Sequence, residues 1–382
     1  MSLRFLQFLT PPQPVTRPEY DGLEFRWRML TFRPALFKQE AVILAIALVY
    51  IAAYFIGKKM NANRANKWFK EQRSILTAQF SRPWQREGLI QDGSSDFFIY
   101  STGRRALTSL HTTLSLRPRH DLAQVAFQFG RGLIELDYKP CDEVELNFAF
   151  RNTPGKEGVP DCVWAVVAKD QIRGIKENRW DLTFTKTTDN PSLPPSLTVM
   201  SEIADVTTNL LKPLGTLSLP AVLSDPALLP YFRSLSLTDQ PRTRPKAPPA
   251  PGAPRTRHLI LSLALPPPSA AQAVRPLIAA SFQLVDAIAG EGKVFGSRGG
   301  LAAALRPETK SKLRKVREEL ARELKEEAGK EKAEEKAEEK AAAKKKAEEE
   351  RLSKLSASDQ KKEMEREKKR LMRKTQGKVK TR

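Results

Sequence analysis

The sequence predicts an α+β domain that follows one N-terminal transmembrane helix and precedes a long charged C-terminal helix. Three observations lead to this prediction: an uncharged apolar run at residues 41–56, a central region that mixes alternating and helical apolar patterns, and a C-terminal region rich in alanine, lysine and glutamate. The elements of the central region follow no strict β-α-β order, which favours α+β over a parallel α/β sheet. We expect a short segment at 1–34, a transmembrane helix at 35–57, a domain at 58–295, a hinge with short helices at 296–324 and a basic helical tail at 325–382.

The chain is strongly basic. Its 382 residues include 65 lysines and arginines against 44 aspartates and glutamates, which gives a formal net charge of +21 at pH 7. Such an excess predicts attraction to a polyanion, either nucleic acid or the anionic surface of a lipid bilayer. The apolar content of 40% is enough to build a real core in a chain of this length.

The apolar run at residues 41–56 contains no charge, amide or proline. As a helix it covers about 24 Å, whereas a bilayer core of about 30 Å asks for about 20 residues. Residues 35–37 extend the apolar part, and Lys38, Lys58 and Lys59 have side chains long enough to reach the headgroups. The alternative is a buried helix of a soluble protein, but helices that are apolar all round are rare there and a lysine pair follows this one at once.

The orientation of this helix follows from the basic residues on either side of it. Residues 57–76 contain six, whereas residues 21–40 contain four together with three acids. The positive-inside rule then predicts a lumenal N-terminus and a cytosolic C-terminal domain. The apolar patch at residues 1–14 is too short for a secretory signal, so we expect the run to act as an uncleaved anchor.

Small residues recur in and just after the run, at Ala41, Ala45, Ala53 and Gly57. Small residues four positions apart allow transmembrane helices to approach closely, so these four are candidates for a face that packs against a partner helix. The alternative is that an alanine-rich run contains such pairs by chance.

The first half of the domain mixes both periodicities. The spacing of Trp68, Leu76 and Phe80 predicts an amphipathic helix that leads from the membrane into the domain. Leu107, Leu110 and Leu114 lie three and four residues apart, which favours a helix over 102–116. Alternating apolar residues predict strands at 96–100, 134–138 and 144–150, the last two joined by a turn at 139–142.

The second half is expected to begin with an apolar strand at 163–168 and another strand from Leu182. Further along, the patterns predict a helix at 196–211, a short helix at 225–233, a strand at 258–265 and a helix at 274–288. The segment 241–254 has six prolines, and Arg242, Pro245 and Pro248 fit the pattern of an SH3-domain ligand. An ordinary surface loop is the alternative.

No catalytic or metal-binding pattern is found. The two cysteines, Cys141 and Cys162, are interpreted as small core residues of a reduced compartment, and the three histidines have no metal-ligand spacing. The glycines between 290 and 300 match no dinucleotide or phosphate-binding fingerprint and are expected to form a hinge. We therefore expect a protein without cofactor that is not an enzyme.

The C-terminal region is almost entirely charged: residues 307–382 contain 27 basic and 18 acidic residues and no aromatic residue. A coiled-coil seam is visible only at Leu313, Val316, Leu320 and Leu324, so a solvated single helix is expected rather than a long dimer. Residues 361–382 contain eleven basic residues and three acids, an excess that favours contact with RNA phosphates. The alternatives are a solubilising tail, membrane headgroups or a localisation signal. Candidate contacts are Lys361, Lys362, Arg366, Lys368, Lys369, Arg370, Arg373 and Lys374.

Several motifs of the chain occur in the same order in a known family. They are GKK at 57–59, ANKWF at 65–69, YSTGR at 100–104, LTVMSEIADV at 197–206 and HLILSLALP at 258–266, followed by the helix at 276–287 and the charged tail. In these features the chain resembles the calumin-like, coiled-coil-domain-containing subunits of the PAT (protein associated with the translocon) complex. The short N-terminal segment is similar to that of fungal members.

The resemblance implies a non-enzymatic subunit of the multipass translocon in the endoplasmic reticulum membrane. Such a subunit pairs with the small membrane subunit Asterix, binds the translating ribosome near the Sec channel and acts as an intramembrane chaperone for client transmembrane helices in the lipid bilayer. By position, a latch beneath the channel falls on about residues 299–324, with Leu301, Leu305, Leu313, Val316 and Leu320 as candidates.

Two further expectations complete this interpretation. Animal members carry a long acidic lumenal segment that is linked to calcium binding, whereas about 34 residues with three acids precede the run here, so we do not expect calcium binding. The alternative function is a membrane-anchored adaptor or tether that acts through the proline-rich loop and the charged helix.

Overall fold

The computed structural model describes residues 22–27, 30–34, 37–85, 88–135, 138–152, 158–245, 255–291 and 300–353. Contacts divide the chain into two compact units. The first contains residues 1–244 and 254–313, and the second contains residues 245–253 and 314–382.

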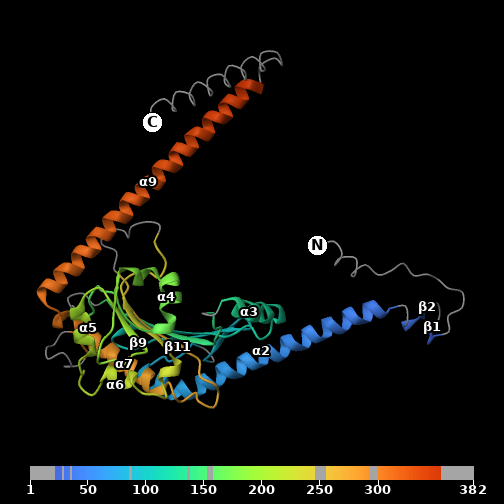
Figure 1. Ribbon diagram of the computed structural model, residues 1–382, viewed down its shortest axis with the longest axis horizontal. Coiled ribbons are helices and arrows are strands. Elements are labelled where there is room, and N and C mark those ends of the chain that lie inside the picture. The colour runs from blue at the N-terminus through green and yellow to red at the C-terminus, as the bar shows by residue number, and fades with distance from the viewer. Residues whose placement is uncertain are drawn as a thin grey trace. The chain divides into compact units, whose positions relative to one another are not determined.

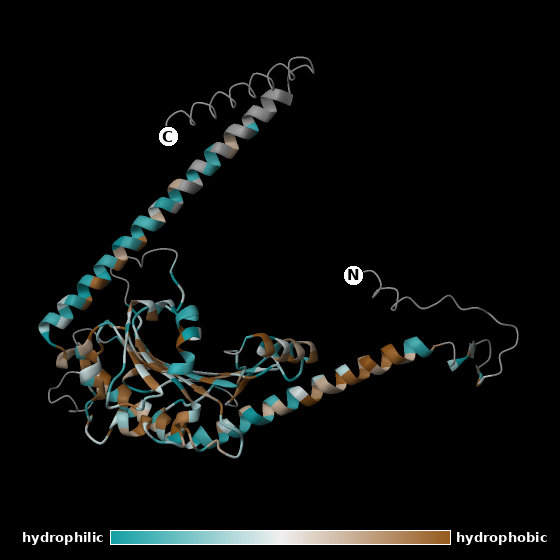
Figure 2. Cartoon of the chain, viewed as in Figure 1, coloured by the Kyte–Doolittle hydropathy of each residue, from teal (hydrophilic) through white to brown (hydrophobic). Residues whose placement is uncertain are grey.

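The apolar run and the amphipathic segment after it form one continuous helix, α2 (Lys38–Gln79). Figure 2 shows it brown along most of its N-terminal half and increasingly teal beyond. Its apolar part is almost wholly exposed, whereas the buried positions of its second half recur every three or four residues and mark one side of the helix. They are Gly57, Asn61, Ala65, Trp68, Gln72 and Leu76. A short antiparallel hairpin precedes α2, made of β1 (Phe25–Trp27) and β2 (Leu30–Phe32).

The domain of the first unit is built on one sheet of nine strands, with the order β3-β4-β5-β6-β11-β10-β7-β9-β8. Figure 1 shows this sheet within the domain, where β9 and β11 are labelled. Every pair of neighbours is antiparallel. The strands are β3 (Ile90–Asp92), β4 (Asp96–Ser101), β5 (Leu107–Ser115), β6 (Glu143–Phe150), β7 (Trp164–Ala168), β8 (Lys186–Thr188), β9 (Leu197–Ser201), β10 (Phe232–Thr238) and β11 (His258–Ala264).

Helices cover the two faces of this sheet unequally. The α-helices of the domain are α3 (Leu122–Ile134), α4 (Ile172–Asn178), α5 (Ala204–Leu211), α6 (Leu219–Leu223), α7 (Arg275–Ala289) and α8 (Leu301–Ala304), and the 3-10 helices are η2 (Lys169–Gln171), η3 (Trp180–Phe184) and η4 (Leu229–Tyr231). The main core joins one sheet face to α2, α5, α6, α7 and α8. A much smaller core on the other face packs β7 and β9 against α4 and η3. The predicted α+β arrangement is therefore confirmed as a mixture of helices and an antiparallel sheet.

Successive side chains of a strand point to opposite faces of the sheet, and this alternation explains why the two faces differ in polarity. In β6, Val144, Leu146 and Phe148 are buried in the main core, while Glu143 and Glu145 point to the other side. In β7 and β9 every residue is buried, because both faces of these two strands are covered. The open side of the sheet is thus mainly polar along β5 and β6 and apolar where α4 and η3 cover β7 and β9.

Several predicted elements are confirmed. The strands expected at 96–100, 144–150, 163–168 and 258–265 correspond to β4, β6, β7 and β11, and the helix expected at 274–288 is α7. The helix α7 ends at Gly290, whose left-handed backbone (φ of 75°) closes the last turn.

The helix predicted over 102–116 is wrong, because this segment holds strand β5. The register of β5 against β6 shifts between Leu107 and Ser109, so an extra residue is accommodated there. This bulge places Leu107, Leu110 and Leu114 on the same face of a strand at a spacing that imitates a helix.

Four other predictions are wrong in part or whole. The segment 196–211 begins as β9, and only its second half is helix α5, because a strand with two covered faces has no period of two to display. The expected strand at Leu182 is the 3-10 helix η3, and the expected helix at 225–233 gives way to η4 and the start of β10. Ile134, assigned to a strand, is the last residue of α3.

The charged region forms one long helix, α9 (Pro307–Ser353), of 47 residues. Its first turns, up to Leu313, belong to the first unit, and the remainder belongs to the second. At 1.5 Å per residue this helix is about 70 Å long.

Candidate functional site

The most constrained polar site of the domain is the joint between α2 and the sheet. Asn61 of α2 has no exposed surface. Its Nδ2 donates to the carbonyl oxygens of Ser94 (3.1 Å) and Arg117 (3.0 Å), and its Oδ1 accepts from Nη1 of Arg119 (3.0 Å). A buried amide satisfied on both sides fixes the rotation of α2 against the domain, because any turn of the helix would leave these groups unpaired.

Asp142, which directly precedes β6, completes this joint. Its carboxylate accepts two hydrogen bonds from the guanidinium of Arg119 (2.8 Å each) and one from the backbone N–H of Arg117 (2.8 Å). Arg64 of α2 approaches the same carboxylate, with Nη2 at 2.9 Å from Oδ2. We call Asn61, Arg64, Arg117, Arg119 and Asp142 the Asp142 network.

Electrostatic attraction between the Asp142 carboxylate and the arginines beside it stabilises the Asp142 network, in addition to its hydrogen bonds. Burial raises the pKa of the Asp142 carboxyl, but the hydrogen bonds from Arg119 and from the backbone of Arg117, and the positive charges of Arg119 and Arg64, outweigh that effect. The net pKa lies below the ordinary aspartate value. The ionised carboxylate is therefore the stable form at neutral pH, and it ties α2 to the loop before α3.

Three successive residues of that loop, at 119, 120 and 121, contact α2 at positions about one helical turn apart. The contacts advance along α2 into the apolar run. A Cβ added to Gly57 would lie 2.2 Å from the carbonyl oxygen of Arg119, so only glycine permits this approach. The His120 ring stacks edge-on against Tyr54, with ring centroids 5.8 Å apart. The Tyr50 hydroxyl then donates to Oδ1 of Asp121 (3.1 Å).

The far end of α2 is attached separately. Gln72 Nε2 donates to the carbonyl of Ala271 (3.3 Å), and Arg104 bridges from Gln79 to Asp286 of α7, where Nη2 and Oδ2 are 2.6 Å apart. With the Asp142 network, these contacts hold the second half of α2 at both of its ends. The apolar run is therefore a rigid extension of the domain core.

The candidate partner-helix residues fall into two environments. Ala41 and Ala45 are exposed and Ala53 is half-buried, whereas Gly57 is buried under the backbone of Arg119. Within the described chain, α2 is the one helix long and apolar enough to cross a membrane.

The candidate latch residues are also divided. Leu301, Leu305 and Leu313 are buried in the main core of the domain. Asp205 of α5 secures the turn between α8 and α9, because its Oδ2 accepts from the backbone N–H of Arg306 (3.1 Å) and from the Thr309 hydroxyl (2.9 Å). Val316 and Leu320 lie further along α9, in the second unit.

The eight tail residues proposed to contact RNA, Lys361 to Lys374, lie outside the described residues, as do Pro248 and most of the proline-rich loop. The charge of the C-terminal region is nevertheless unevenly distributed. Helix α9 contains fifteen basic and fourteen acidic residues, whereas residues 354–382 contain twelve basic and four acidic ones. The excess of positive charge is thus concentrated beyond α9.

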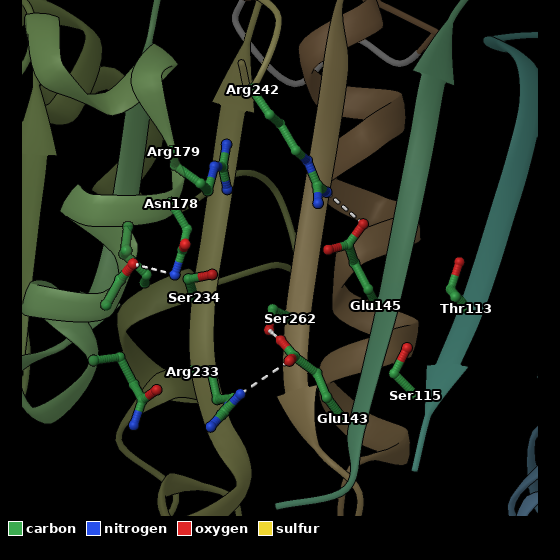
Figure 3. Close-up of a pocket in the computed structure, with 13 residues that line it drawn as sticks. Thr113, Ser115, Glu143, Glu145, Asn178, Arg179, Arg233, Ser234, Arg242 and Ser262 are labelled. Carbon is green, nitrogen blue, oxygen red and sulfur yellow. Dashed lines mark hydrogen bonds and ion pairs between the residues drawn. The ribbon is translucent and has the colours of Figure 1, made fainter. Parts of the chain in front are cut away.

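A polar groove of about 500 Å³ lies on the open face of the sheet. Figure 3 shows Arg233 pointing to Glu143 and Arg242 pointing to Glu145 across this groove. The Ser262 hydroxyl also donates to Glu143 (2.5 Å). Because each of these carboxylates is paired with an arginine, the groove offers no unpaired carboxylate as a general base.

The remaining candidates for chemistry lie elsewhere. Nδ1 of His258 is 2.8 Å from Oδ1 of Asn147, and burial, with a smaller contribution from the charge of Arg242, lowers the pKa of this histidine. Burial raises the pKa of the Cys141 thiol, and Cys162 is buried in the main core. Among the described residues, no three histidine, cysteine, aspartate or glutamate side chains gather as metal ligands would.

The Asp142 network was not predicted from the sequence. Its members lie at 61, 64, 117, 119 and 142, and nothing local joins them. One signal was present: two polar residues, Asn61 and Gln72, lie among the apolar or small residues at the buried positions of α2. A polar residue on the buried side of a helix indicates a specific hydrogen-bond partner in the fold.

Comparison with known proteins places this architecture in a family. The family model described as PAT complex subunit CCDC47 matches residues 36–374. The UPF0674 endoplasmic reticulum membrane protein C2G5.01 of Schizosaccharomyces pombe is 31% identical over 178 residues, which is 44% of this chain and 46% of the relative. An uncharacterized protein of Arabidopsis thaliana is 26% identical over 223 residues, or 53% of this chain and 43% of the relative. The matches thus cover less than half the length of either curated relative. Because the family match includes α2, the sheet domain and α9, the chain belongs to the PAT complex subunit CCDC47 family.

Proposed function

We propose that this protein is a single-pass membrane protein of the endoplasmic reticulum and a non-enzymatic subunit of the PAT complex. In this role it binds the translating ribosome near the Sec channel and aids the insertion and folding of multi-spanning membrane proteins. The family match and the description of the yeast relative as an endoplasmic reticulum membrane protein support the proposal. The observation that carries it is the continuity of α2, whose exposed apolar half leads directly into a half fixed to the domain by the Asp142 network.

This continuity suits a protein that must hold a cytosolic body at a defined position on a membrane. A flexible linker after a span would let the domain move freely, whereas a helix clamped at Asn61 and Gln72 transmits the orientation of the span to the sheet. The positive-inside rule supports a cytosolic placement of the domain.

The tail supplies the proposed attraction to the ribosome. Helix α9 is nearly neutral and about 70 Å long, so it acts as a spacer, and the basic residues beyond it contact ribosomal RNA phosphates. Aromatic residues are absent from residues 307–382, so base stacking is not available and the contact is independent of RNA sequence.

Ribosome co-sedimentation over a series of salt concentrations tests this role of the tail. In one variant the eight candidate residues, Lys361, Lys362, Arg366, Lys368, Lys369, Arg370, Arg373 and Lys374, are changed to glutamine. The matched control changes eight lysines of α9, at 325, 330, 332, 336, 340, 344, 345 and 346, to glutamine, so both variants lose the same total charge.

We expect the tail variant to bind more weakly and with a flatter salt dependence than the control. Each lost phosphate contact reduces the slope of log affinity against log salt concentration by about 0.7–0.9. Equal losses in the two variants would show that only the net charge matters and would remove the tail from the mechanism.

The small membrane subunit Asterix is proposed to pack on the exposed small residues of α2. The backbone of Arg119 already packs against Gly57, so only Ala41, Ala45 and Ala53 remain available to a partner helix. A photo-crosslinking amino acid at Ala45 is expected to capture a small membrane protein in microsomes, and one at Ile43, on the opposite side of the helix, to label lipid. An adaptor that acts through the proline-rich loop would instead enrich neither Asterix nor the Sec channel.

A further inference from the structure

Helix α3 carries its apolar side chains on the outside of the protein. No residue of α3 is buried, and Phe127, Phe129, Leu133 and Ile134 are 70%, 71%, 71% and 84% exposed. The polar side chains occupy a narrow opposite side of the helix, where Gln128 is half-buried and the partly exposed Arg131 pairs with Glu135 and lies 4.3 Å from the ring centroid of Tyr138. A helix on a water-exposed surface has the opposite arrangement. In Figure 2 much of the α3 ribbon is brown, as expected for a helix rich in apolar residues.

The position of α3 along α2 is fixed by the loop that precedes it. Arg119 lies against Gly57, His120 against Tyr54, and Asp121 against Tyr50. Asp121 is also the N-cap of α3, where its side chain accepts from the backbone N–H groups of the first turn. The start of α3 is therefore level with Tyr50, seven residues and about 10 Å above Gly57 on the α2 axis.

Tyr50 belongs to the apolar run, and the run is so short that all of its residues are needed to cross the hydrocarbon core of a bilayer. Its sixteen residues cover about 24 Å of a hydrocarbon core of about 30 Å. If α2 spans a membrane, as the proposed function requires, Tyr50 lies within the leaflet on the side of the domain. The first turn of α3 must then enter the same leaflet.

We propose that α3 lies at the boundary between the headgroups and the acyl chains of this leaflet, with Phe129 and Leu133 facing the acyl chains. The domain then has two attachments to the membrane, one through the bilayer and one along its surface. Interfacial helices insert their apolar side about 5–10 Å into the boundary between headgroups and acyl chains, which matches the level of Tyr50. A shallow helix beside a short span also suits the local thinning that a short span imposes on the bilayer.

Phospholipid is favoured over a protein partner as the occupant of this surface. Helix α3 contacts α2, and the Tyr50–Asp121 hydrogen bond joins the start of α3 to the apolar run. Lys58 and Lys59, immediately after the apolar run, lie at the level where anionic headgroups are expected. On the narrow polar side of α3, Arg131 pairs with Glu135 and lies over the Tyr138 ring, whereas the wider apolar side is left exposed.

Depth-dependent fluorescence quenching tests the proposal with the full-length chain. A fluorescent amino acid replaces Phe129 or Leu133 on the apolar side of α3, or Gln124 on its polar side. Ile46 serves as a reference within the span and Thr187 of β8 as a reference in water. Each variant is reconstituted in phosphatidylcholine–phosphatidylserine vesicles that contain phospholipids with a doxyl quencher either near the headgroup or in the middle of the acyl chain.

We expect the reporters at Phe129 and Leu133 to be quenched most by the shallow doxyl lipid, the reporter at Ile46 by the deep one, and the reporter at Thr187 by neither. If Ile46 is quenched and Phe129 is not, α3 lies outside the bilayer and this inference fails, while the span stands. If Ile46 is not quenched by either lipid, the span itself fails, and with it the membrane role proposed above. A blue-shifted but unquenched reporter at Phe129 would mean that a second copy of the chain covers α3, and would also overturn the inference.

Discussion

At the scale of single residues, the Asp142 carboxylate accepts hydrogen bonds from residues that are far apart in the sequence. Its side chain is only 3% exposed and receives Arg64 from α2 and Arg119 from the loop before α3. We expect Asp142→Asn to reduce the free energy of unfolding by about 3 kcal/mol, because it leaves two arginines close together without the carboxylate that neutralises them. Thermal or chemical unfolding of the detergent-solubilised protein measures this loss.

The matched control is Asp189→Asn, which removes an exposed carboxylate that also pairs with a cation, Lys169 (2.9 Å). Its effect should stay within about 0.5 kcal/mol, since exposed pairs contribute little. The pH dependence gives a second test. Because the pKa of Asp142 is lowered in the folded state, its contribution is present above the ordinary aspartate range and is lost as the pH falls through the folded-state value. The difference between wild type and Asp142→Asn should therefore shrink in acid, and a difference that grows in acid would contradict the assignment.

Gly57 is the second residue whose chemistry is fixed by the joint. Alanine normally stabilises a helix relative to glycine by about 1 kcal/mol. At this position the added Cβ would meet the Arg119 carbonyl at 2.2 Å, and a backbone atom cannot move aside cheaply. We expect Gly57→Ala to destabilise the protein by about 1–3 kcal/mol. In Gly174→Ala, on α4, the new methyl group has open space around it, so the same substitution should be neutral or stabilising there. Equal changes in the two variants would rule out the close approach.

These residue-scale features were largely beyond prediction from the sequence. The apolar run of α2 was recognised from local composition alone, because a membrane span is specified by consecutive residues. The Asp142 network depends on which elements are neighbours: β5 pairs with β6, which brings Arg117 close to Asp142, and Arg64 reaches Asp142 from α2. The spacing of small residues predicts that Gly57 lies on a partner-helix face. In the structure, the close approach of the Arg119 backbone already requires glycine at this position.

At the scale of elements, prediction succeeded where one face of an element is buried and failed where the period is disturbed. The strands β4 and β6 and the helix α7 show clear periods and were found. The bulge in β5 produced a false helical spacing. Helix α3 was not predicted, although the spacing of Leu122, Val125, Phe129 and Leu133 indicates a helix; Gly130 and Gly132 lower the helix propensity of its second half.

The short helix α8, which precedes α9 in the chain, is held to the rest of the domain by a close backbone contact. A Cβ added to Gly300 would lie 2.0 Å from the carbonyl oxygen of Ile288 and 2.5 Å from that of Gly158. We expect Gly300→Ala to separate α8 from the core and to speed amide hydrogen exchange over residues 300–313. Gly329→Ala, in α9, meets nothing within 4 Å and should leave that exchange unchanged. Slow exchange at Leu301 and Leu305 in both variants would show that α8 does not depend on this contact.

At the scale of the whole molecule, three regions have distinct physical roles. The exposed apolar half of α2 is long and apolar enough to cross a membrane, the sheet domain supplies a rigid body fixed to α2, and residues 354–382 concentrate the positive charge. Each role follows from a property that can be recognised in the sequence: hydropathy for the apolar half of α2, periodicity for the domain and charge for the tail. What the sequence left open is how firmly the first two regions are joined.

The orientation of the whole molecule in the membrane can be decided by engineered glycosylation. The natural sequence contains no Asn-X-Ser/Thr acceptor with X other than proline. The substitution Pro14→Asn creates one with Val15 and Thr16 on the N-terminal side of α2, and Lys186→Asn creates one with Thr187 and Thr188 on the exposed strand β8. Because basic residues are denser after the span than before it, we expect the first variant to be glycosylated in microsomes and the second not. The reverse result would place the domain in the lumen, out of reach of any ribosome, and the single-pass orientation proposed here would be wrong.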